Sequence, residues 1–252
     1  MVAQNDLLRV IELQGTVAQL IVRGKRDPAQ VAEVLQVVND HADFAERLGL
    51  APREQPKDVQ EAIREDLALW AKFDREVFGV IYDPAALLVP QAPDADFRWP
   101  IVIPEGMTMN RVIATMRDAG LKVLLYTEEL DRDVSENDRA PKNGAYVVLV
   151  RAREEADEEL ANRSADELKT AGISGTTLLE QLRLVFFYWW KTGGKKRGKY
   201  LDVKNWTLCE GSRYSGGDVP SVYWDPIDQA VYVSWTNRHA QNPDLRARAV
   251  RS

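Results

Sequence analysis

The chain has 252 residues, of which 45% are hydrophobic and 29% are charged, and its formal net charge is −6. This composition is typical of a folded water-soluble protein and argues against a disordered one. The overall field of an acidic chain repels nucleic acid, so we do not expect DNA or RNA as its main partner. Cys209 is the single cysteine, which excludes an intrachain disulfide and a metal site built from several cysteines.

The first residues, MVAQNDLLRV, lack a basic segment followed by an apolar stretch, so we expect no signal peptide. The longest apolar run, Leu184–Trp190, is much shorter than the roughly 20 residues that cross a bilayer. We therefore expect no membrane span and a cytoplasmic location.

Residues 1–79 are predicted to form a helical region. Apolar residues recur at helical spacing over 5–23 and over 31–48, and Asp27-Pro28 is a typical helix start. After Pro56 a third helix is predicted, with Val59, Ile63, Leu67, Trp70 and Phe73 on one face. These amphipathic helices are expected to pack on one another, and the sequence leaves open a homo-oligomer formed through one of their faces.

Residues 80–144 are predicted to form a linker followed by a small βαβ-like segment. Three prolines lie within 80–97, which favours a boundary there. The next segments predict a strand over Trp99–Ile103, a helix over Met107–Ala119 and a strand over Lys122–Tyr126. Residues 127–143 are polar and are expected to form an exposed loop.

Residues 145–252 are predicted to form a domain with two helices between strands. Ala145–Arg151 is a β-branched run, Ser164 and Glu167 match a capping box, and Gly175–Lys191 is a strongly apolar helix. Short strands are predicted over Trp206–Cys209, Val219–Asp225, Ala230–Trp235 and Leu245–Val250. The whole chain is therefore expected to be an α+β protein.

Two of these strands alternate in character. Val222 and Trp224 are predicted to point inward, and so are Val231, Val233 and Trp235. The opposite positions, Ser221, Tyr223, Asp225, Ala230, Tyr232 and Ser234, are predicted to point outward. A half-solvated sheet is the simpler interpretation. Tyr and small polar residues also provide rigid contact area and adaptable hydrogen bonds, as in antibody binding loops, which favours a recognition surface.

The last 42 residues contain no Lys and no Glu, although both residue types are common up to Glu210. Their charges come from Arg and Asp instead. Strands disfavour Asp more than Glu, so strand propensity does not predict this pattern. Codons that end in a pyrimidine specify Asn, Asp, Tyr, Ser and Arg but never Lys or Glu. Randomising the adenines of such codons would therefore produce Arg and Asp without Lys and Glu. A chance composition of this segment is the alternative interpretation.

The segment WTLCEGSRYSGGDVPSVYWDPIDQAVYVSWTNRHAQNPDLRARAV (206–250) resembles the variable proteins of diversity-generating retroelements in small-genome candidate-phylum bacteria, and so does ISGTTLLEQL (173–182). The stretches DLLRVIELQGTVAQLIV and DPAQVAEVLQ match more loosely. The resemblance implies N-terminal amphipathic helices followed by a C-type-lectin-like domain over 145–252. Short antiparallel strands, with the first and last strands paired, are expected in that domain.

The resemblance also implies a role for individual positions. The fixed frame would include Trp206, Leu208, Cys209, Ser212, Val219, Pro220, Trp224, Val233, Trp235, Leu245 and Arg246. The variable, ligand-binding positions would include Tyr214, Asp218, Ser221, Tyr223, Asp225, Asp228, Tyr232, Ser234, Asn237, Arg238 and His239. A protein or a glycan is the expected ligand.

No pattern of residues predicts catalysis. The only histidines are His41 and His239, and the carboxylate pairs such as Glu128-Glu129 lie in polar segments. There is no phosphate loop, dinucleotide fingerprint or zinc spacing, so no cofactor and no metal is expected. C-type-lectin-like folds also include formylglycine-generating enzymes, but Cys209 alone does not supply their cysteine-based copper site. We therefore expect a binding protein and not an enzyme.

One basic segment supports a different function. Residues 193–199, GGKKRGK, follow a helix whose end contains Tyr188, Trp189 and Trp190. A basic loop beside aromatic residues predicts contact with phosphate groups, so a nucleic-acid-associated adaptor is the alternative. A solvated turn whose cations favour the C-terminus of the helix is the simpler interpretation.

Overall fold

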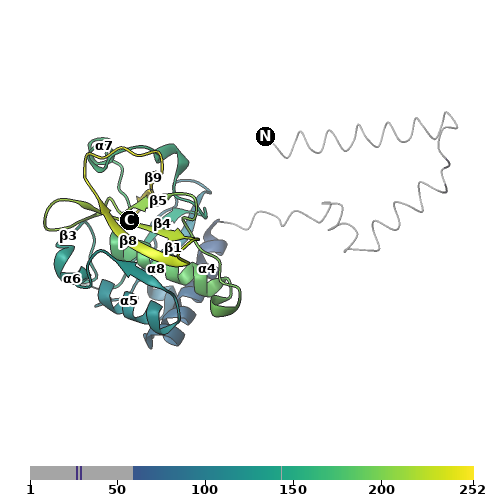
Figure 1. Cartoon of the computed structure of the whole chain (residues 1–252). Helices are drawn as coiled ribbons and strands as arrows, with labels where there is room; N and C mark the ends of the chain where they lie inside the picture. Colours follow the sequence, from purple (N-terminus) through teal and green to yellow (C-terminus); the bar gives the residue numbers. More distant parts are fainter. Residues whose placement is uncertain (1–26, 28, 30–58, 143) are drawn as a thin grey trace. The chain divides into compact units, whose positions relative to one another are not determined.

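The computed structural model describes residues 27, 29, 59–142 and 144–252. The helices predicted over 5–23 and 31–48, and self-association through them, lie outside the described residues. Residues Lys57–Ser252 form one compact unit (Figure 1). The boundaries expected near residues 80 and 145 fall inside this unit, so the segment between them shares its core with residues 145–252.

Helices and strands are mixed along this unit, as the α+β prediction requires. The helices are α4 (Val59–Phe73), α5 (Met109–Asp118), α6 (Leu130–Asp133), α7 (Ala165–Thr170) and α8 (Leu178–Lys191). The π-helical turn η1 (Asp74–Phe78) and the 3-10 turns η2 (Pro84–Ala86) and η3 (Glu158–Leu160) lie between them, and the 3-10 turn η4 (Gly194–Lys196) follows α8.

Local sequence signals explain where these helices begin and which face they bury. Ser164 and Thr177 each form a complete capping box, with Glu167 and Glu180 as partners, so orphan backbone groups are satisfied at both helix starts. In α4 the apolar face predicted from the sequence is confirmed at Ile63, Leu67, Trp70 and Phe73, which are buried. Val59, at the start of the helix, is half-buried.

The strands form three sheets. A three-stranded antiparallel sheet has the order β1 (Phe97–Ile103), β4 (Tyr146–Arg151), β10 (Val250–Arg251). A five-stranded sheet has the order β2 (Val123–Leu125), β8 (Ala230–Thr236), β7 (Val219–Asp225), β5 (Trp206–Leu208), β9 (Leu245–Ala247). The two-stranded sheet pairs β3 (Glu136–Asn137) with β6 (Ser212–Arg213).

The expectation of antiparallel strands alone is wrong for the five-stranded sheet. β2 pairs with β8 in parallel, and β9 pairs with β5 in parallel. The physical reason is that β2 and β9 reach the sheet through connections longer than a hairpin. Only the hairpin-linked pair β7 and β8, and the pair β5 and β7, are antiparallel.

Two other predictions need correction. The single strand expected over Leu245–Val250 is two strands in different sheets, because the chain turns where Arg248 is buried against Asp202. The exposed loop expected over 127–143 contains α6 and β3, and its apolar residues Leu130 and Val134 are buried. Periodicity did not reveal these elements because each is only two to four residues long.

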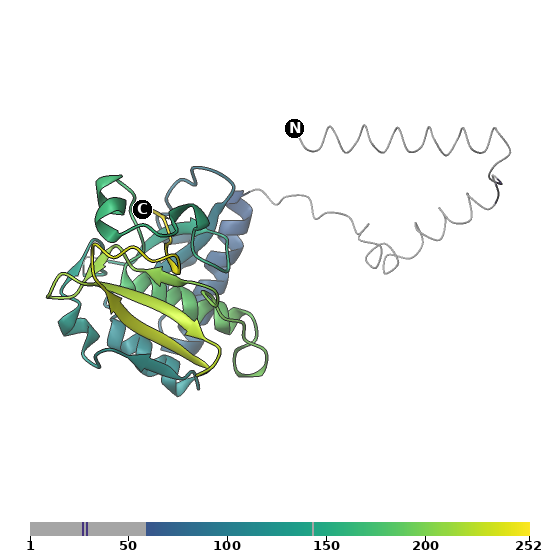
Figure 2. The ribbon, with the colours of Figure 1, turned by 45° about the horizontal axis from the view of Figure 1, so that its top comes forward.

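Helix α8 is central to the packing. It contacts α4, α5, β1 and β7, so it lies between the three-stranded and five-stranded sheets. In Figures 1 and 2 the green helix lies behind the yellow-green strands of the five-stranded sheet. Aromatic rings join α8 to α4: Trp70 stacks on Phe187 at a centroid distance of 3.9 Å, and Phe73 meets Phe186 edge-on at 5.3 Å.

Buried ion pairs fix α8 and its surroundings. The guanidinium of Arg183 lies 2.6 Å from the carboxylate of Asp74, and neither side chain is exposed to solvent. Burial lowers the pKa of Arg183, and the Asp74 carboxylate opposes that change. Further pairs join Arg139 to Glu180 and Arg248 to Asp202, each with an N–O distance of 2.7 Å. A buried charge without its partner is strongly destabilising, so these pairs specify one arrangement of the elements.

Candidate functional site

An aromatic ridge crosses the outer face of the five-stranded sheet. It consists of Trp206 on β5, Tyr223 on β7 and Tyr232 on β8, and Tyr223 and Tyr232 are direct partners in the strand register. The ring centroids of Trp206 and Tyr223 are 5.0 Å apart, and those of Tyr223 and Tyr232 are 5.1 Å apart. Cross-strand neighbours on one face of a pleated sheet are placed at this spacing by the strand geometry.

The rings of this aromatic ridge cover one another's faces. The Tyr223 and Tyr232 planes differ by 7°, and the Trp206 and Tyr223 planes by 25°. Trp206 is 37% exposed, and both tyrosines are partly exposed. Stacked rings that rise from a sheet turn their edges outward, so the ridge offers ring edges and the Tyr223 hydroxyl to a ligand.

Acidic residues fix the turn beside the ridge. The Asp225 carboxylate accepts hydrogen bonds from the backbone N–H groups of Ile227 and Asp228, at 2.7 and 3.0 Å. The Tyr232 hydroxyl donates to the carboxylate of Asp228. This hydrogen bond to a charged acceptor raises the pKa of Tyr232 to about 12. Three of the predicted ligand-binding residues, Asp225, Asp228 and Tyr232, are therefore brought together at one end of the hairpin.

At the other end of β8, Arg238 and His239 lie against the start of α7. The Arg238 Nε and the His239 Nδ1 are 2.9 and 2.8 Å from the Asp166 carboxylate. The hydrogen bond from Arg238 holds the pKa of Asp166 below its usual range. Both side chains are exposed, as is Asn237, and Ser234 is half-buried. These predicted residues are accessible, but Arg238 and His239 are also held by a partner within the protein.

The structure contradicts the surface position expected for Tyr214 and Ser221. Tyr214 is only 6% exposed, and its ring lies edge-on to Tyr126 at 5.9 Å. Burial raises the pKa of its hydroxyl. Ser221 is 1% exposed, although it lies on the same strand face as Tyr223, because its register neighbour Leu208 is buried there. Period-two alternation separates the faces of a strand but does not show how much of a face is covered.

Asp218 is the last of the predicted ligand-binding residues, and Ala230 was predicted only to point outward. Asp218 is half-buried, and its carbonyl accepts a hydrogen bond from the Tyr214 N–H at 2.9 Å. Ala230, expected to point outward, is buried at the start of β8. The exposed part of the predicted set therefore consists of Tyr223, Asp225, Asp228, Tyr232, Ser234, Asn237, Arg238 and His239, with Asp218 at its margin.

Sequence reasoning missed three exposed aromatic residues. Trp206 and Trp235 were assigned to the fixed frame, but they are 37% and 43% exposed. Trp235 lies at the end of β8 beyond the core, where its ring centroid is 5.8 Å from that of Tyr126, a residue that is itself 63% exposed. No local signal separates these positions from buried ones, since the neighbouring polar residue Asn205 is itself buried, and the exposure of Trp235 depends on where the core ends.

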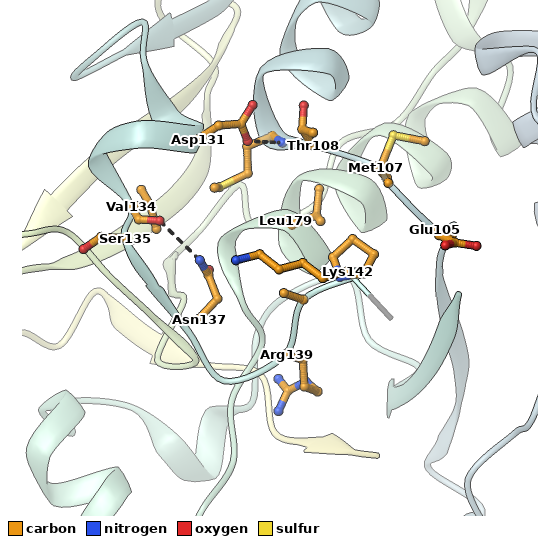
Figure 3. A pocket seen from close by; sticks show the side chains of 14 residues that line it. Glu105, Met107, Thr108, Asp131, Val134, Ser135, Asn137, Arg139, Lys142 and Leu179 are labelled. Carbon is orange, nitrogen blue, oxygen red and sulfur yellow. Dashed lines mark hydrogen bonds between the residues drawn. The ribbon is translucent and has the colours of Figure 1, made fainter. Parts of the chain in front are cut away.

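A separate pocket of about 450 Å³ lies between the turn before α5 and the segment that contains α6 and β3 (Figure 3). Its polar side chains mostly serve the fold. Asp131 accepts from the backbone N–H of Met109 at 2.8 Å and thereby caps α5. The Asn137 amide donates to the Val134 carbonyl at 3.2 Å, and Arg139 is bound to Glu180. The geometry therefore does not identify an acid–base pair in this pocket.

Nucleophilic chemistry also has no support in the geometry. Cys209 is fully buried, and burial raises the pKa of its thiol well above the ordinary value, so the reactive thiolate is disfavoured. Within residues 59–142 and 144–252, no three His, Cys, Asp or Glu side chains are grouped so that they could hold a metal ion. In the same part of the chain, no helix has the length and apolar character needed to cross a membrane.

Comparison with known proteins gave no relative: no protein-family model, no curated protein and no solved structure matches this chain.

Proposed function

We propose that this protein binds a macromolecular ligand through the outer face of its five-stranded sheet, and that the face is diversified as in the variable proteins of diversity-generating retroelements. The proposal treats residues 145–252 as a C-type-lectin-like scaffold. Two features support it: the strand, helix, helix, strands order, and the antiparallel pairing of β4 with the C-terminal β10. The role is binding and not catalysis.

The observation that carries the proposal is the aromatic ridge with its acidic turn. Its residues contact mainly one another: Trp206 stacks on Tyr223, Tyr223 on Tyr232, and Tyr232 donates to Asp228. The inward positions Val222, Val231 and Val233 are buried in the core instead. Because the variable residues and the core residues are separate, substitutions on this face can change the ligand while the protein stays folded.

The shape of the ridge favours a protein as the ligand over a glycan. Sugar rings stack on exposed aromatic faces, whereas the stack covers both faces of Tyr223 and one face each of Trp206 and Tyr232. A projecting row of tyrosine and tryptophan edges is suited to a groove in a partner, where such residues are common anchors of binding energy.

Population sequencing tests the diversification directly. The gene segment that encodes residues 206–250 is sequenced in the native population together with its flanking DNA. We expect substitutions at the codons of Tyr223, Asp225, Asp228, Tyr232 and Ser234, traced to adenines in a nearby near-repeat. The codons of Val222, Val231 and Val233 are the matched controls on the same strands. Equal variation at both sets, or none at either, would overturn the proposal.

Binding is tested separately with a displayed peptide library and a glycan array as probes. A Tyr223→Ala, Tyr232→Ala variant is expected to lose at least tenfold in affinity for any selected peptide, which corresponds to about 1.4 kcal/mol. The control is Leu88→Ala, because Leu88 is 92% exposed but lies outside the five-stranded sheet. Glycan binding that the double variant abolishes, with no peptide selected by the unaltered protein, would contradict a protein ligand at the ridge.

A further inference from the structure

A basic pocket of about 770 Å³ lies next to the turn of the β7–β8 hairpin. Three parts of the chain line it: the loop 194–198, the turn 120–122 before β2, and Asp228 with Gln229. Aromatic residues complete the lining, namely Trp189 from α8 and the stacked pair of Tyr200 and Trp224, whose centroids are 3.3 Å apart.

The loop on one side of this basic pocket is held in a definite conformation. Gly194 has a left-handed backbone, with φ of 57°, and begins the short turn η4. The Gly198 N–H donates to the Gly194 carbonyl at 2.7 Å, and the Lys199 N–H donates to the Thr192 hydroxyl at 2.8 Å. A Cβ on Gly198 would lie 2.4 Å from the Trp189 ring. Only glycine therefore lets the loop lie this close to the indole.

Four cationic side chains line this pocket from both sides. Lys195, Lys196 and Arg197 come from the loop, and Lys122 comes from the opposite wall. The side chain of Lys195 crosses toward that wall, since its Cε would be 2.5 Å from a Cβ placed on Gly120. The loop therefore reaches across the pocket, and its positive charge is concentrated beside that of Lys122.

The protein does not neutralise this positive charge within the described part of the chain. Lys195, Lys196 and Arg197 form no ion pair with residues 59–142 or 144–252. The Lys122 ammonium donates to the backbone carbonyl of Asp228 at 3.1 Å, while the Asp228 carboxylate accepts from Tyr232. The carboxylate of Asp228, the one acid in the lining, is therefore bound to Tyr232 and does not pair with these cations.

We infer that the basic pocket binds a phosphate group, carried either by a nucleotide-sized molecule or by a nucleic-acid strand. Clustered cations that lack an internal counter-ion are stabilised by a multiply charged anion, and phosphate offers several acceptor oxygens to ammonium and guanidinium donors. The local cluster attracts such a ligand although the chain as a whole has a net charge of −6. The basic pocket shares Asp228 with the acidic turn beside the aromatic ridge, but its cations lie outside the ridge, so either proposal can fail alone.

The test uses the full chain and three probes: inorganic pyrophosphate, ADP and a labelled single-stranded oligonucleotide. Binding is measured between about 50 and 200 mM salt, a range over which phosphate contacts weaken steeply. A Lys195→Ala, Lys196→Ala variant is expected to bind at least tenfold more weakly to whichever probe binds. If the oligonucleotide binds, the variant should reduce the slope of log affinity against log salt by about 1.4, which is about 0.7 for each lost cation on a single strand.

Lys204→Ala is the matched control, because Lys204 is an exposed lysine outside the lining of the basic pocket. The unfolding midpoint of each variant is measured as well, and no change is expected since all three lysines are exposed. Binding of the oligonucleotide alone would identify a strand as the phosphate source, and binding of pyrophosphate or ADP would identify a small molecule. The inference is overturned if no probe binds, or if the double variant and Lys204→Ala bind equally well.

Discussion

In helix α8, Arg183 is fully buried and pairs with Asp74, which is 109 residues away in the sequence, whereas in the β7–β8 hairpin Tyr232 donates to Asp228, only four residues away. The helix shares its polar contacts with distant elements, so a change there disturbs several of them. On the outer face of the hairpin, the side-chain hydrogen bond of Tyr232 is local and partly exposed. This difference divides the protein into a fixed frame and a face that tolerates substitution.

The largest effect should come from breaking the frame. Asp74→Asn leaves the buried Arg183 without its counter-charge, so we expect the free energy of unfolding to fall by about 3–5 kcal/mol in urea denaturation. Glu76→Gln, in the same turn η1, is the control, because the Lys72–Glu76 pair is exposed and 3.9 Å apart. That change should cost less than about 1 kcal/mol. Equal losses in the two variants would contradict the central role of the buried pair.

A second comparison lies within the hairpin itself, between two serines that are register partners. Ser221 is 1% exposed and Ser234 is half-buried, although both lie on the outer strand face. Ser221→Tyr should lower the free energy of unfolding by about 1–3 kcal/mol through overpacking. Ser234→Tyr should change it by no more than about 0.5 kcal/mol. If Ser221→Tyr is tolerated equally well, the covered part of this face is smaller than the structure indicates.

The coupling within the aromatic ridge should be smaller still. A double-mutant cycle with Tyr223→Ala and Tyr232→Ala is expected to give a coupling free energy of about 0.5–1 kcal/mol, the range of a cross-strand aromatic pair. Tyr223→Ala combined with Leu88→Ala serves as the reference, since distant sites should be additive. A ridge coupling no larger than that of the reference pair would show that the rings do not support one another.

The last prediction concerns the ionisation of the Tyr232 hydroxyl. The hydrogen bond to Asp228 raises the pKa of Tyr232 from 10.0 to about 12. Because the pKa is raised, the hydrogen bond stabilises the turn fully below about pH 10, and this stabilisation is lost as the pH rises through about 12. Asp228→Asn should return the pKa toward 10, measured by tyrosinate absorbance against Tyr232→Phe. Asp244→Asn, another exposed aspartate, should leave the titration of Tyr232 unchanged.

Local signals predicted much of the fold. The bounds of β7 agree with the predicted strand, and α8 ends at the predicted Lys191. The capping box at Ser164 is confirmed, and Cys209 is buried as its predicted strand position implied. These features depend on residues close together in the chain, where spacing and hydrogen-bonding capacity are sufficient to predict the outcome.

The candidate site was predicted only in part. Alternation placed Tyr223, Asp225 and Tyr232 on the outer face, where they are partly exposed. Alternation also placed Ser221 at the surface, and the resemblance placed Tyr214 there, but the structure buries both. The exposed rings of Trp206 and Trp235 were missed. The basic loop was recognised from its composition, but no local pattern indicated that Lys122 and Trp224 lie beside it.

The sequence by itself determined the longer helices of residues 59–252, the main strands and which residues share a strand face, because these follow from local periodicity and capping. Only the tertiary structure decided which part of a face is covered, which strands pair in parallel, and which distant charges meet. Arg183 with Asp74, Arg248 with Asp202 and the stack of Trp206 on Tyr223 join residues from separate elements. Such contacts depend on how the elements pack around α8, and no local pattern in the chain encodes that arrangement.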